Sequence, residues 1–194
     1  GISNVNGIRA FSCFGKGTKS CGLTGNASFV SGESSFTTSV WIYKIASEDV
    51  IKGEKWVILS DGNGGELLTQ EKGGIFRSNM NNPAQGGSFI SNTDKKLVLG
   101  KANLTPGWHL LTLRYDKEAG TLRLYIDGVG KKYHSVVINE KYKISSFFGP
   151  SYQGYFGLIY AYENVFSDDI IYSNYQEMSS YYEETSMIPF SLNS

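Results

Sequence analysis

The chain has 194 residues, which is long enough to bury a core, and we expect residues 1–194 to form a single domain. Its 18 lysines and arginines balance 18 aspartates and glutamates, so no net charge draws the protein to nucleic acid or to an anionic membrane surface. No apolar run approaches the roughly 20 residues that span a bilayer, and we expect no membrane insertion.

Residue usage favours strands and tight turns over helices. Aromatic residues make up 14% of the chain, and 23 residues are glycines. We find no linker, internal repeat or low-complexity block that would divide the chain. The composition therefore predicts an all-β protein.

The two cysteines, Cys13 and Cys21, flank a turn-like Gly-Lys-Gly-Thr segment. A disulfide across a short hairpin is sterically feasible in an oxidising compartment. Two ordinary free thiols are an equally good interpretation of this spacing. Without a neighbouring pair of histidines, the cysteines do not predict a zinc site.

The first half of the chain contains several predicted strands: Ile8–Phe14, 23–30, Phe36–Lys44, 56–60, 66–70 and 74–80. In Phe36–Lys44 the side chains alternate, with Val40 and Ile42 on one face and Trp41 and Tyr43 on the other. Because both faces carry large side chains, we expect this strand to lie in the middle of a sheet.

Residues 108–127 predict a β-hairpin, in which two alternating apolar runs flank a five-residue connection that ends in Gly120. The side chains expected on its buried face are His109, Leu111, Leu113, Tyr115, Leu122, Leu124 and Ile126. Arg114, Arg123 and Tyr125 fall on the opposite face. A further antiparallel strand is predicted at 133–138, after an Asp-Gly turn.

Two segments near the C-terminus indicate how the sheets are covered. Residues 155–162 have no polar face, so we expect a strand that is covered on both sides and a second layer of sheet. After Ser167, which is a suitable N-cap, apolar residues recur at helical spacing and predict a short helix on the sandwich: Ile171, Tyr175, Met178 and Tyr182. Residues 183–194 are apolar enough to dock back onto the body.

Three of these stretches, at 35–44, 107–129 and 154–176, resemble the laminin-G-like branch of the concanavalin A-like lectin and glucanase superfamily. The first holds the strand SFTTSVWIYK, the second the hairpin, and the third the closing strand and the start of the helix. The resemblance implies a two-sheet antiparallel jelly-roll sandwich with one short helix near the C-terminus. It also implies an extracellular or cell-surface module that binds glycans or surface proteins. Because the sequence opens without the pattern of a signal peptide, we expect such a signal to have been removed, and a cytosolic protein is the alternative.

Catalytic chemistry is not predicted. Glycosidases of this superfamily place two carboxylates on one strand face, and no strand here carries such a pair: Glu66 and Glu71 flank an apolar strand, and Glu33 lies in a serine-rich turn. For His109 and His134 we expect structural roles. The shared face of Arg114, Arg123 and Tyr125 keeps a polysaccharide lyase as an alternative.

A polar loop and a segment before the closing strand are the predicted ligand-binding site: Arg77, Asn79, Asn81, Asn82, Gln85, Tyr152 and Gln153. Amides and arginine can bind sugar hydroxyls, and an aromatic ring can stack on a sugar. The alternative is that both segments are solvated connections. Asp61, Asn63 and Glu66 offer oxygen ligands for calcium, which many members of the superfamily bind, and an ordinary glycine turn is the alternative.

Three functions follow, in order of preference. The first is a non-catalytic carbohydrate-binding or adhesion module. The second is a protein-interaction or assembly module, which a flat apolar patch without a groove would favour. The third is a polysaccharide-active enzyme, either a lyase or a glucanase-like hydrolase.

Overall fold

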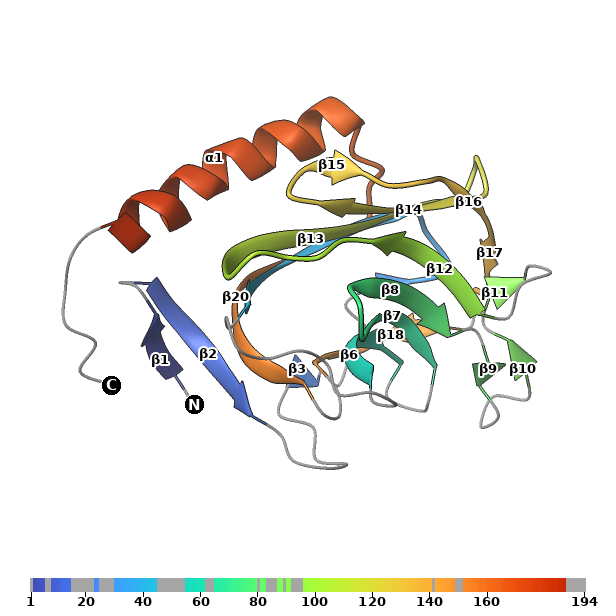
Figure 1. The fold of residues 1–194 in the computed structure, drawn as a ribbon. Helices are drawn as coiled ribbons and strands as arrows, with labels where there is room; N and C mark the ends of the chain where they lie inside the picture. The colour runs from blue at the N-terminus through green and yellow to red at the C-terminus, as the bar shows by residue number, and fades with distance from the viewer. Residues whose placement is uncertain are drawn as a thin grey trace.

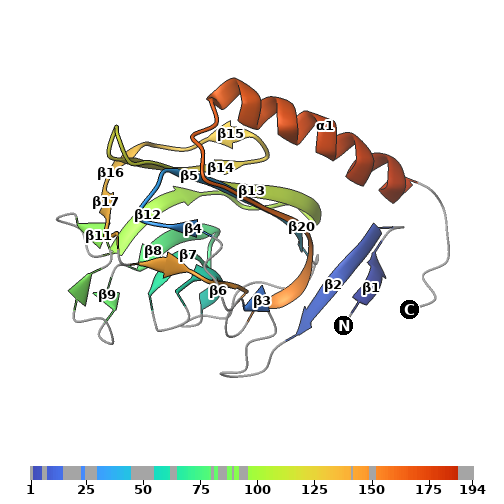
Figure 2. The ribbon, with the colours of Figure 1, turned by 180° about the vertical axis from the view of Figure 1, so that it is seen from behind.

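The computed structural model describes residues 2–5, 8–14, 23–24, 30–44, 55–61, 65–79, 81–82, 87–88, 90–91, 96–140, 142–148 and 152–187. Within these residues two antiparallel sheets and one helix form the body of the protein (Figure 1). The helix lies outside one sheet, and the second sheet lies inside the curve of the first, as the opposite view also shows (Figure 2). The protein is therefore a β-sandwich with a helix on one outer face.

The larger sheet contains eight of the described strands. Their order is β1 (Ile2–Val5), β2 (Ile8–Phe14), β20 (Gln153–Tyr162), β5 (Phe36–Lys44), β13 (Gly107–Asp116), β14 (Thr121–Ile126) and β15 (Val129–Gly130), with β16 (His134–Ser135) also paired to β14. The smaller sheet runs in the order β12 (Lys96–Lys101), β8 (Ile75–Asn79), β7 (Glu66–Glu71), β6 (Lys55–Ser60), β19 (Ser146–Phe147) and β3 (Leu23–Thr24). Short pairs join β9 (Asn81–Asn82) to β10 (Gly87–Ser88), β11 (Ile90–Ser91) to β17 (Val137–Ile138), and β4 (Val30–Ser31) to β18 (Lys143–Ile144).

Strand β5 lies between β20 and β13, in the central position that its two-sided bulk predicts. Val40 and Ile42 point into the core between the sheets, where each is at most 3% exposed. Trp41 points outward and is also buried, because α1 (Asp168–Met187) covers it. Its indole ring stacks on Tyr182 of α1 at a centroid distance of 4.2 Å.

The hairpin is confirmed as β13 paired with β14, and its apolar rows lie in the core between the two sheets. The strand predicted at 133–138 is divided. Its first part, β16, pairs with β14, whereas β17 leaves the large sheet and pairs with β11. The prediction of one continuous strand there is wrong, since alternation along a segment does not show which neighbour each half will find.

Strand β20 is covered on one side only over its second half. Phe156 is buried in the core, but Leu158 is 49% exposed and Tyr162 is 44% exposed. The expectation that both faces would be covered is therefore wrong for this half. Helix α1 does not close over these outward side chains, and the space that it leaves is the groove described below.

Helix α1 begins where Ser167 predicts, because its hydroxyl accepts a hydrogen bond from the Ile170 amide at 3.2 Å. Ile171 and Tyr182 are buried at 3% and 2% exposure, as their spacing predicts. The helix has 20 residues and is longer than predicted, since it takes in the first part of 183–194. Among the described residues, no helix is long and apolar enough to cross a membrane.

Cys13 lies in β2, is fully buried and is disulfide-bonded. This favours the disulfide over the free-thiol interpretation of the two cysteines. Cys21, the other cysteine of the sequence, lies outside the described residues.

Candidate ligand-binding site

Two of the predicted ligand-binding residues, Arg77 and Asn79, lie at alternate positions of β8 and use hydrogen bonds within their own sheet. The Arg77 guanidinium donates to Glu71 at 2.5 Å across the strand pair. The Asn79 amide donates to Glu66 at 3.2 Å, and Glu66 also accepts from the Lys55 ammonium at 2.5 Å. The structure therefore gathers these residues on one sheet, but their described contacts serve the sheet.

Tyr152 lies in the core and is 1% exposed. Its ring packs against Phe148 at 4.5 Å and Trp56 at 5.4 Å, and its hydroxyl donates to the Tyr155 carbonyl at 3.2 Å. It is a packing residue, and the prediction that its ring would stack on a ligand is wrong. Gln85 and the side chains of three other predicted residues lie outside the described part, so these remain predictions: Asn81, Asn82 and Gln153.

Of the predicted calcium ligands, Asp61 and Glu66 lie in the described part of the chain. The Asp61 carboxylate accepts the Gly65 amide hydrogen at 2.9 Å, and the Asp61 amide donates to the Gly65 carbonyl at 3.0 Å. The Glu66 carboxylate faces the Lys55 ammonium, which offsets its charge. The described residues fit the glycine-turn interpretation, and among them no cluster of metal-ligating side chains forms. Asn63 lies outside the described residues, and calcium binding remains a prediction.

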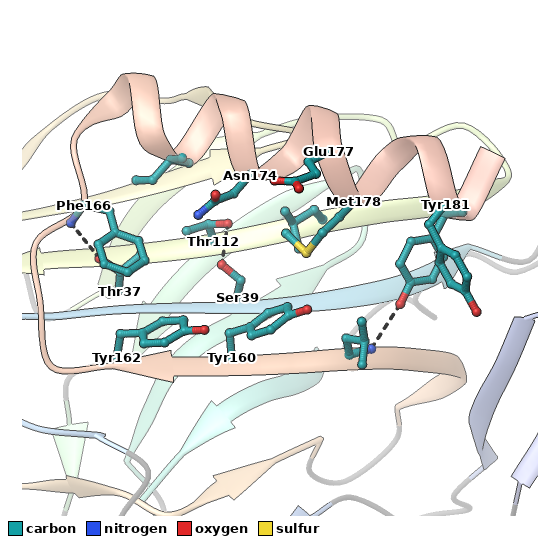
Figure 3. A pocket seen from close by; sticks show the side chains of 14 residues that line it. Thr37, Ser39, Thr112, Tyr160, Tyr162, Phe166, Asn174, Glu177, Met178 and Tyr181 are labelled. Atoms are coloured by element: carbon teal, nitrogen blue, oxygen red, sulfur yellow. Dashed lines mark hydrogen bonds between the residues drawn. The ribbon is translucent and has the colours of Figure 1, made fainter. Parts of the chain in front are cut away.

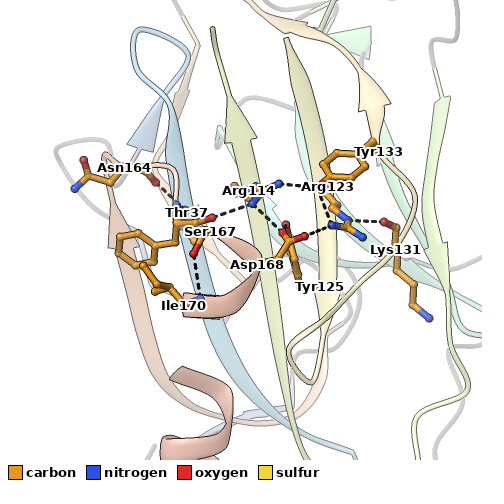
Figure 4. A network of polar contacts seen from close by, with 11 residues as sticks. Thr37, Arg114, Arg123, Tyr125, Lys131, Tyr133, Asn164, Ser167, Asp168 and Ile170 are labelled. Carbon is orange, nitrogen blue, oxygen red and sulfur yellow. Dashed lines mark hydrogen bonds and ion pairs between the residues drawn. The ribbon is translucent and has the colours of Figure 1, made fainter. Parts of the chain in front are cut away.

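The residues that kept a lyase as an alternative are bound to Asp168, the first residue of α1 (Figure 4). Its carboxylate accepts from Arg114 at 3.0 Å, from Arg123 at 2.8 Å and from the Tyr125 hydroxyl at 2.5 Å. Tyr133 completes this set, and its hydroxyl accepts from both guanidiniums. We call these five residues the Asp168 clasp.

Within the clasp, the pKa values of Tyr125 and Asp168 are shifted in opposite directions. Burial raises the pKa of the Tyr125 hydroxyl well above its usual value, and its hydrogen bond to Asp168 adds to the shift. The hydrogen bond from Tyr125 and the charges of Arg123 and Arg114 lower the pKa of Asp168, despite some burial. Tyr125 therefore stays protonated as a donor, and the clasp holds the first turn of α1 on the sheet.

His109 has the structural role that the sequence predicts. It is buried, with one ring nitrogen 2.7 Å from the Asp127 carboxylate and the other 2.6 Å from the Thr105 carbonyl. Burial and the charge of Lys44 lower its pKa, but the hydrogen bonds and charge of these two acceptors outweigh them, and the pKa is raised. Both nitrogens face acceptors, so the imidazolium is the form that this site stabilises.

A groove of about 420 Å³ lies between α1 and the outer face of the large sheet (Figure 3). Its floor is made by outward residues of β5 and β13, namely Thr37, Ser39 and Thr112. The Ser39 and Thr112 hydroxyls are hydrogen-bonded to each other at 2.8 Å. We call this site the tyrosine groove, for the residues of its wall.

The groove exists because side-chain size changes along the outward row of β5. Trp41 fills the space under the C-terminal part of α1, whereas Ser39 and Thr37, at the preceding outward positions, are small. On the neighbouring strand β13, Thr112 is likewise small. The helix is supported by the tryptophan at one side and by the Asp168 clasp at the other, so the stretch between them stays open.

One wall of the groove is formed by tyrosines of β20. The rings of Tyr160 and Tyr162 are 6.1 Å apart and nearly parallel, at an interplanar angle of 12°. Phe166 continues this wall, with its ring 5.2 Å from that of Tyr162. Burial raises the pKa of Tyr160, and Tyr162 adds a smaller contribution. The wall therefore offers neutral aromatic faces with a protonated hydroxyl at Tyr160.

The opposite wall is one face of α1. Asn174, Glu177, Met178 and Tyr181 lie on it at spacings of three, four and seven residues, and Figure 3 shows Asn174 and Met178 directed toward the sheet. The sequence alone does not predict this site, because its parts come from β5, β13, β20 and α1. The available signal was the polar pair Asn174 and Glu177 within the apolar stripe of the helix.

No family model and no curated protein matches the sequence. Among solved structures, the chain is similar to the binding domain of Paraclostridial Mosquitocidal Protein 1, with a TM-score of 0.61 and 14% identity over 92% of this chain and 45% of that one. It is similar to domain 4 of AbnA, a GH43 extracellular arabinanase from Geobacillus stearothermophilus solved with arabinotriose, with a TM-score of 0.57 and 14% identity over 89% and 79%. It is also similar to the CBM40 of the Ruminococcus gnavus IT-sialidase, with a TM-score of 0.52 and 14% identity over 85% and 95%.

At this level of identity the likenesses show the fold alone. They agree with the β-sandwich architecture, and the similar structures are a neurotoxin binding domain, an arabinanase domain and a sialidase CBM40. The chain spans about half of the length of the toxin binding domains that it matches.

Proposed function

We propose that this protein is a non-catalytic glycan-binding module of an extracellular or cell-surface protein, and that the tyrosine groove is its binding site. The observation that carries this proposal is the open groove in which Tyr160 and Tyr162 face Asn174 and Glu177 across a floor of hydroxyl groups. The jelly-roll and laminin-G-like relationships remain part of the proposal.

The groove has the two chemical features that bind a sugar. Sugar rings carry apolar C–H faces, which pack on aromatic rings such as those of Tyr160 and Tyr162. They also carry hydroxyls at their edges, for which the amide of Asn174 and the carboxylate of Glu177 are hydrogen-bonding partners. A ligand lying between the two walls would use both features at once.

Catalysis is not part of the proposal. Most glycosidases place two carboxylates on either side of the bond that they hydrolyse, and Glu177 is the one carboxylate among the described residues that line the groove. The lyase alternative needs a free base, whereas Tyr125 is hydrogen-bonded to Asp168 and its pKa is raised. Both arguments support binding without turnover.

The protein-interaction alternative would be favoured by a flat apolar patch without a groove. The outer face of the large sheet is instead hollowed at the tyrosine groove, and its floor is polar. Similar folds serve both uses: one similar structure holds arabinotriose, and another, the binding domain of botulinum neurotoxin DC, holds rat synaptotagmin II. The hollow shape supports a small saccharide over a protein surface.

The test is glycan binding by the purified protein, first on an array and then by calorimetry with the best ligand. We expect the double substitution of Tyr160→Ala and Tyr162→Ala to weaken binding at least about fivefold, since stacked aromatic faces contribute about 0.5–1.5 kcal/mol each. The matched control is Tyr172→Ala, which removes an exposed tyrosine of α1 outside the groove. Unchanged affinity in the double variant, or no binding on a broad array, would contradict the proposal.

A further inference from the structure

The charge of the tyrosine groove is one-sided. Among the described residues that line it, Glu177 carries the one formal charge at neutral pH, and none is a lysine, arginine or histidine. The remaining polar groups are hydroxyls and the Asn174 amide, which are neutral. A ligand in the groove therefore meets a carboxylate and finds no cation there.

The nearest arginine along the floor is directed elsewhere. Arg114 follows Thr112 at the next outward position of β13, and its side chain is only 9% exposed. One of its guanidinium nitrogens donates to the Phe166 carbonyl at 2.9 Å and to Asp168 at 3.0 Å. The other donates to the Tyr133 hydroxyl at 3.2 Å. The clasp thus holds this cation and partly neutralises it outside the groove.

The size of the groove limits its occupant to a short piece of glycan. Small-molecule pockets in proteins range from roughly 300 to 1,000 Å³. At about 420 Å³, the groove falls in the lower part of that range. The groove ends at the aromatic side chains of Phe166 on one side and Tyr181 on the other (Figure 3). A ligand of one or two sugar rings fits these limits.

Resting on the proposed glycan-binding function, we propose that the tyrosine groove selects uncharged or amine-bearing sugars and excludes sugars that carry a carboxylate or a sulfate. Sugar anions are bound elsewhere in proteins by arginine or lysine, which can donate charge-assisted hydrogen bonds to them. Here an anion would lie near Glu177 with no cation to offset the repulsion. An ammonium group on the sugar would instead pair with this carboxylate.

The test compares disaccharides of different charge: glucosamine, N-acetylglucosamine and glucuronate forms, together with a sialylated disaccharide. We expect the neutral and amine-bearing forms to bind the wild-type protein and the acidic forms to bind at least about fivefold more weakly at low salt. The gap should shrink as salt is added, because Glu177 is exposed and its field is screened.

The variant Glu177→Gln tests the charge of this side chain separately from its size. This variant keeps the size of the side chain and removes its charge, so the change in affinity for the N-acetylated form serves as the reference for the lost carboxylate contact. Relative to that reference, affinity for the amine-bearing form should fall about fivefold further, and the acidic forms should gain. Glu163→Gln, in an exposed residue outside the groove, is the matched control.

The outcomes distinguish the two proposals. Tight binding of an acidic sugar that is lost in Tyr160→Ala would overturn the charge selection and leave glycan binding in the groove intact. Binding of neutral sugars that none of the groove variants changes would overturn the location of the site and the charge selection with it. Failure of every sugar to bind would overturn both proposals.

Discussion

At the scale of single residues, His109 shows how burial and hydrogen bonding compete. Its ring is buried, which disfavours a charge, yet Asp127 and Thr105 place an acceptor at each nitrogen. Asp127 also accepts the Leu110 amide at 2.9 Å, so one carboxylate ties the histidine to the turn after β14. The folded hairpin therefore stabilises the protonated form of His109.

We expect the free energy of unfolding to fall as pH rises through the folded pKa of His109. This pKa is raised above the unfolded value of 6.5, so the contribution is fully present below pH 6.5 and is lost on the alkaline side. Urea unfolding between about pH 5 and about pH 9 measures it. His109→Gln should remove this pH dependence and cost about 1–3 kcal/mol at low pH. A wild-type curve that is flat across this range would contradict the assignment.

Gly157 is a residue whose absent side chain matters. A Cβ atom there would lie 2.5 Å from the Tyr182 hydroxyl and 3.3 Å from Trp41. That hydroxyl accepts the Leu158 amide hydrogen at 3.2 Å, and burial raises the pKa of Tyr182 to about 12. The C-terminal part of α1 thus packs closely against Gly157 of β20 through the Tyr182 side chain.

Gly157→Ala should displace Tyr182 and cost about 1–3 kcal/mol of stability, because the packed tyrosine has little room to move. Hydrogen exchange of the α1 amides near Tyr182 should become faster, while exchange in β13 stays slow. Combining it with Tyr182→Phe, which removes the hydroxyl, should recover part of the loss, so that the two changes are not additive. Strict additivity would show that the hydroxyl is not the obstacle.

At the scale of elements, α1 is positioned by the Asp168 clasp at its N-terminus and by the stack of Tyr182 on Trp41 toward its C-terminus. The clasp joins β13, β14 and the helix through one carboxylate. An acidic residue in the first turn also favours the helix dipole. Asp168 therefore contributes both to the helix and to its docking.

Asp168→Asn should lower stability by about 1–2 kcal/mol, a modest figure because water reaches the 52% exposed carboxylate. The matched control is Asp169→Asn, which keeps the clasp. The pKa of Asp168 is lowered, so its contribution is present above the unfolded value of 3.8 and is lost as pH falls through the folded pKa. Thermal melts of both variants measure this difference, and equal melting temperatures would contradict the role given to the clasp.

The groove itself can be filled from its floor. Ser39→Leu places an apolar side chain in the hollow, and we expect it to abolish glycan binding while the far-ultraviolet circular dichroism stays that of a β-sandwich. Ser39→Ala is the matched control, since both variants lose the hydrogen bond to Thr112, worth about 1 kcal/mol. Only the larger substitution should block the site. Equal binding by both variants would place the ligand elsewhere.

At the scale of the whole molecule, the sequence was informative about elements whose cause is local. Alternation in β5 and in the hairpin predicted strands and buried faces, and Ser167 predicted the start of α1. The burial of Tyr152 could not be predicted, because it depends on Trp56, which is remote in the chain. The groove could not be predicted, since it requires β5, β13, β20 and α1 to be placed relative to one another.

Helix α1 contacts the sheet through Asp168 near its N-terminus and through Tyr182 toward its C-terminus, and the groove lies under the residues between them. A saccharide that contacts both the β20 wall and Asn174 or Glu177 would link the middle of α1 to the sheet. A bound sugar would then slow the opening of the backbone hydrogen bonds of α1, because a ligand that binds only the folded state stabilises the contacts that it bridges. The order of α1 would thus report whether the site is filled, even for a sugar that causes no visible rearrangement.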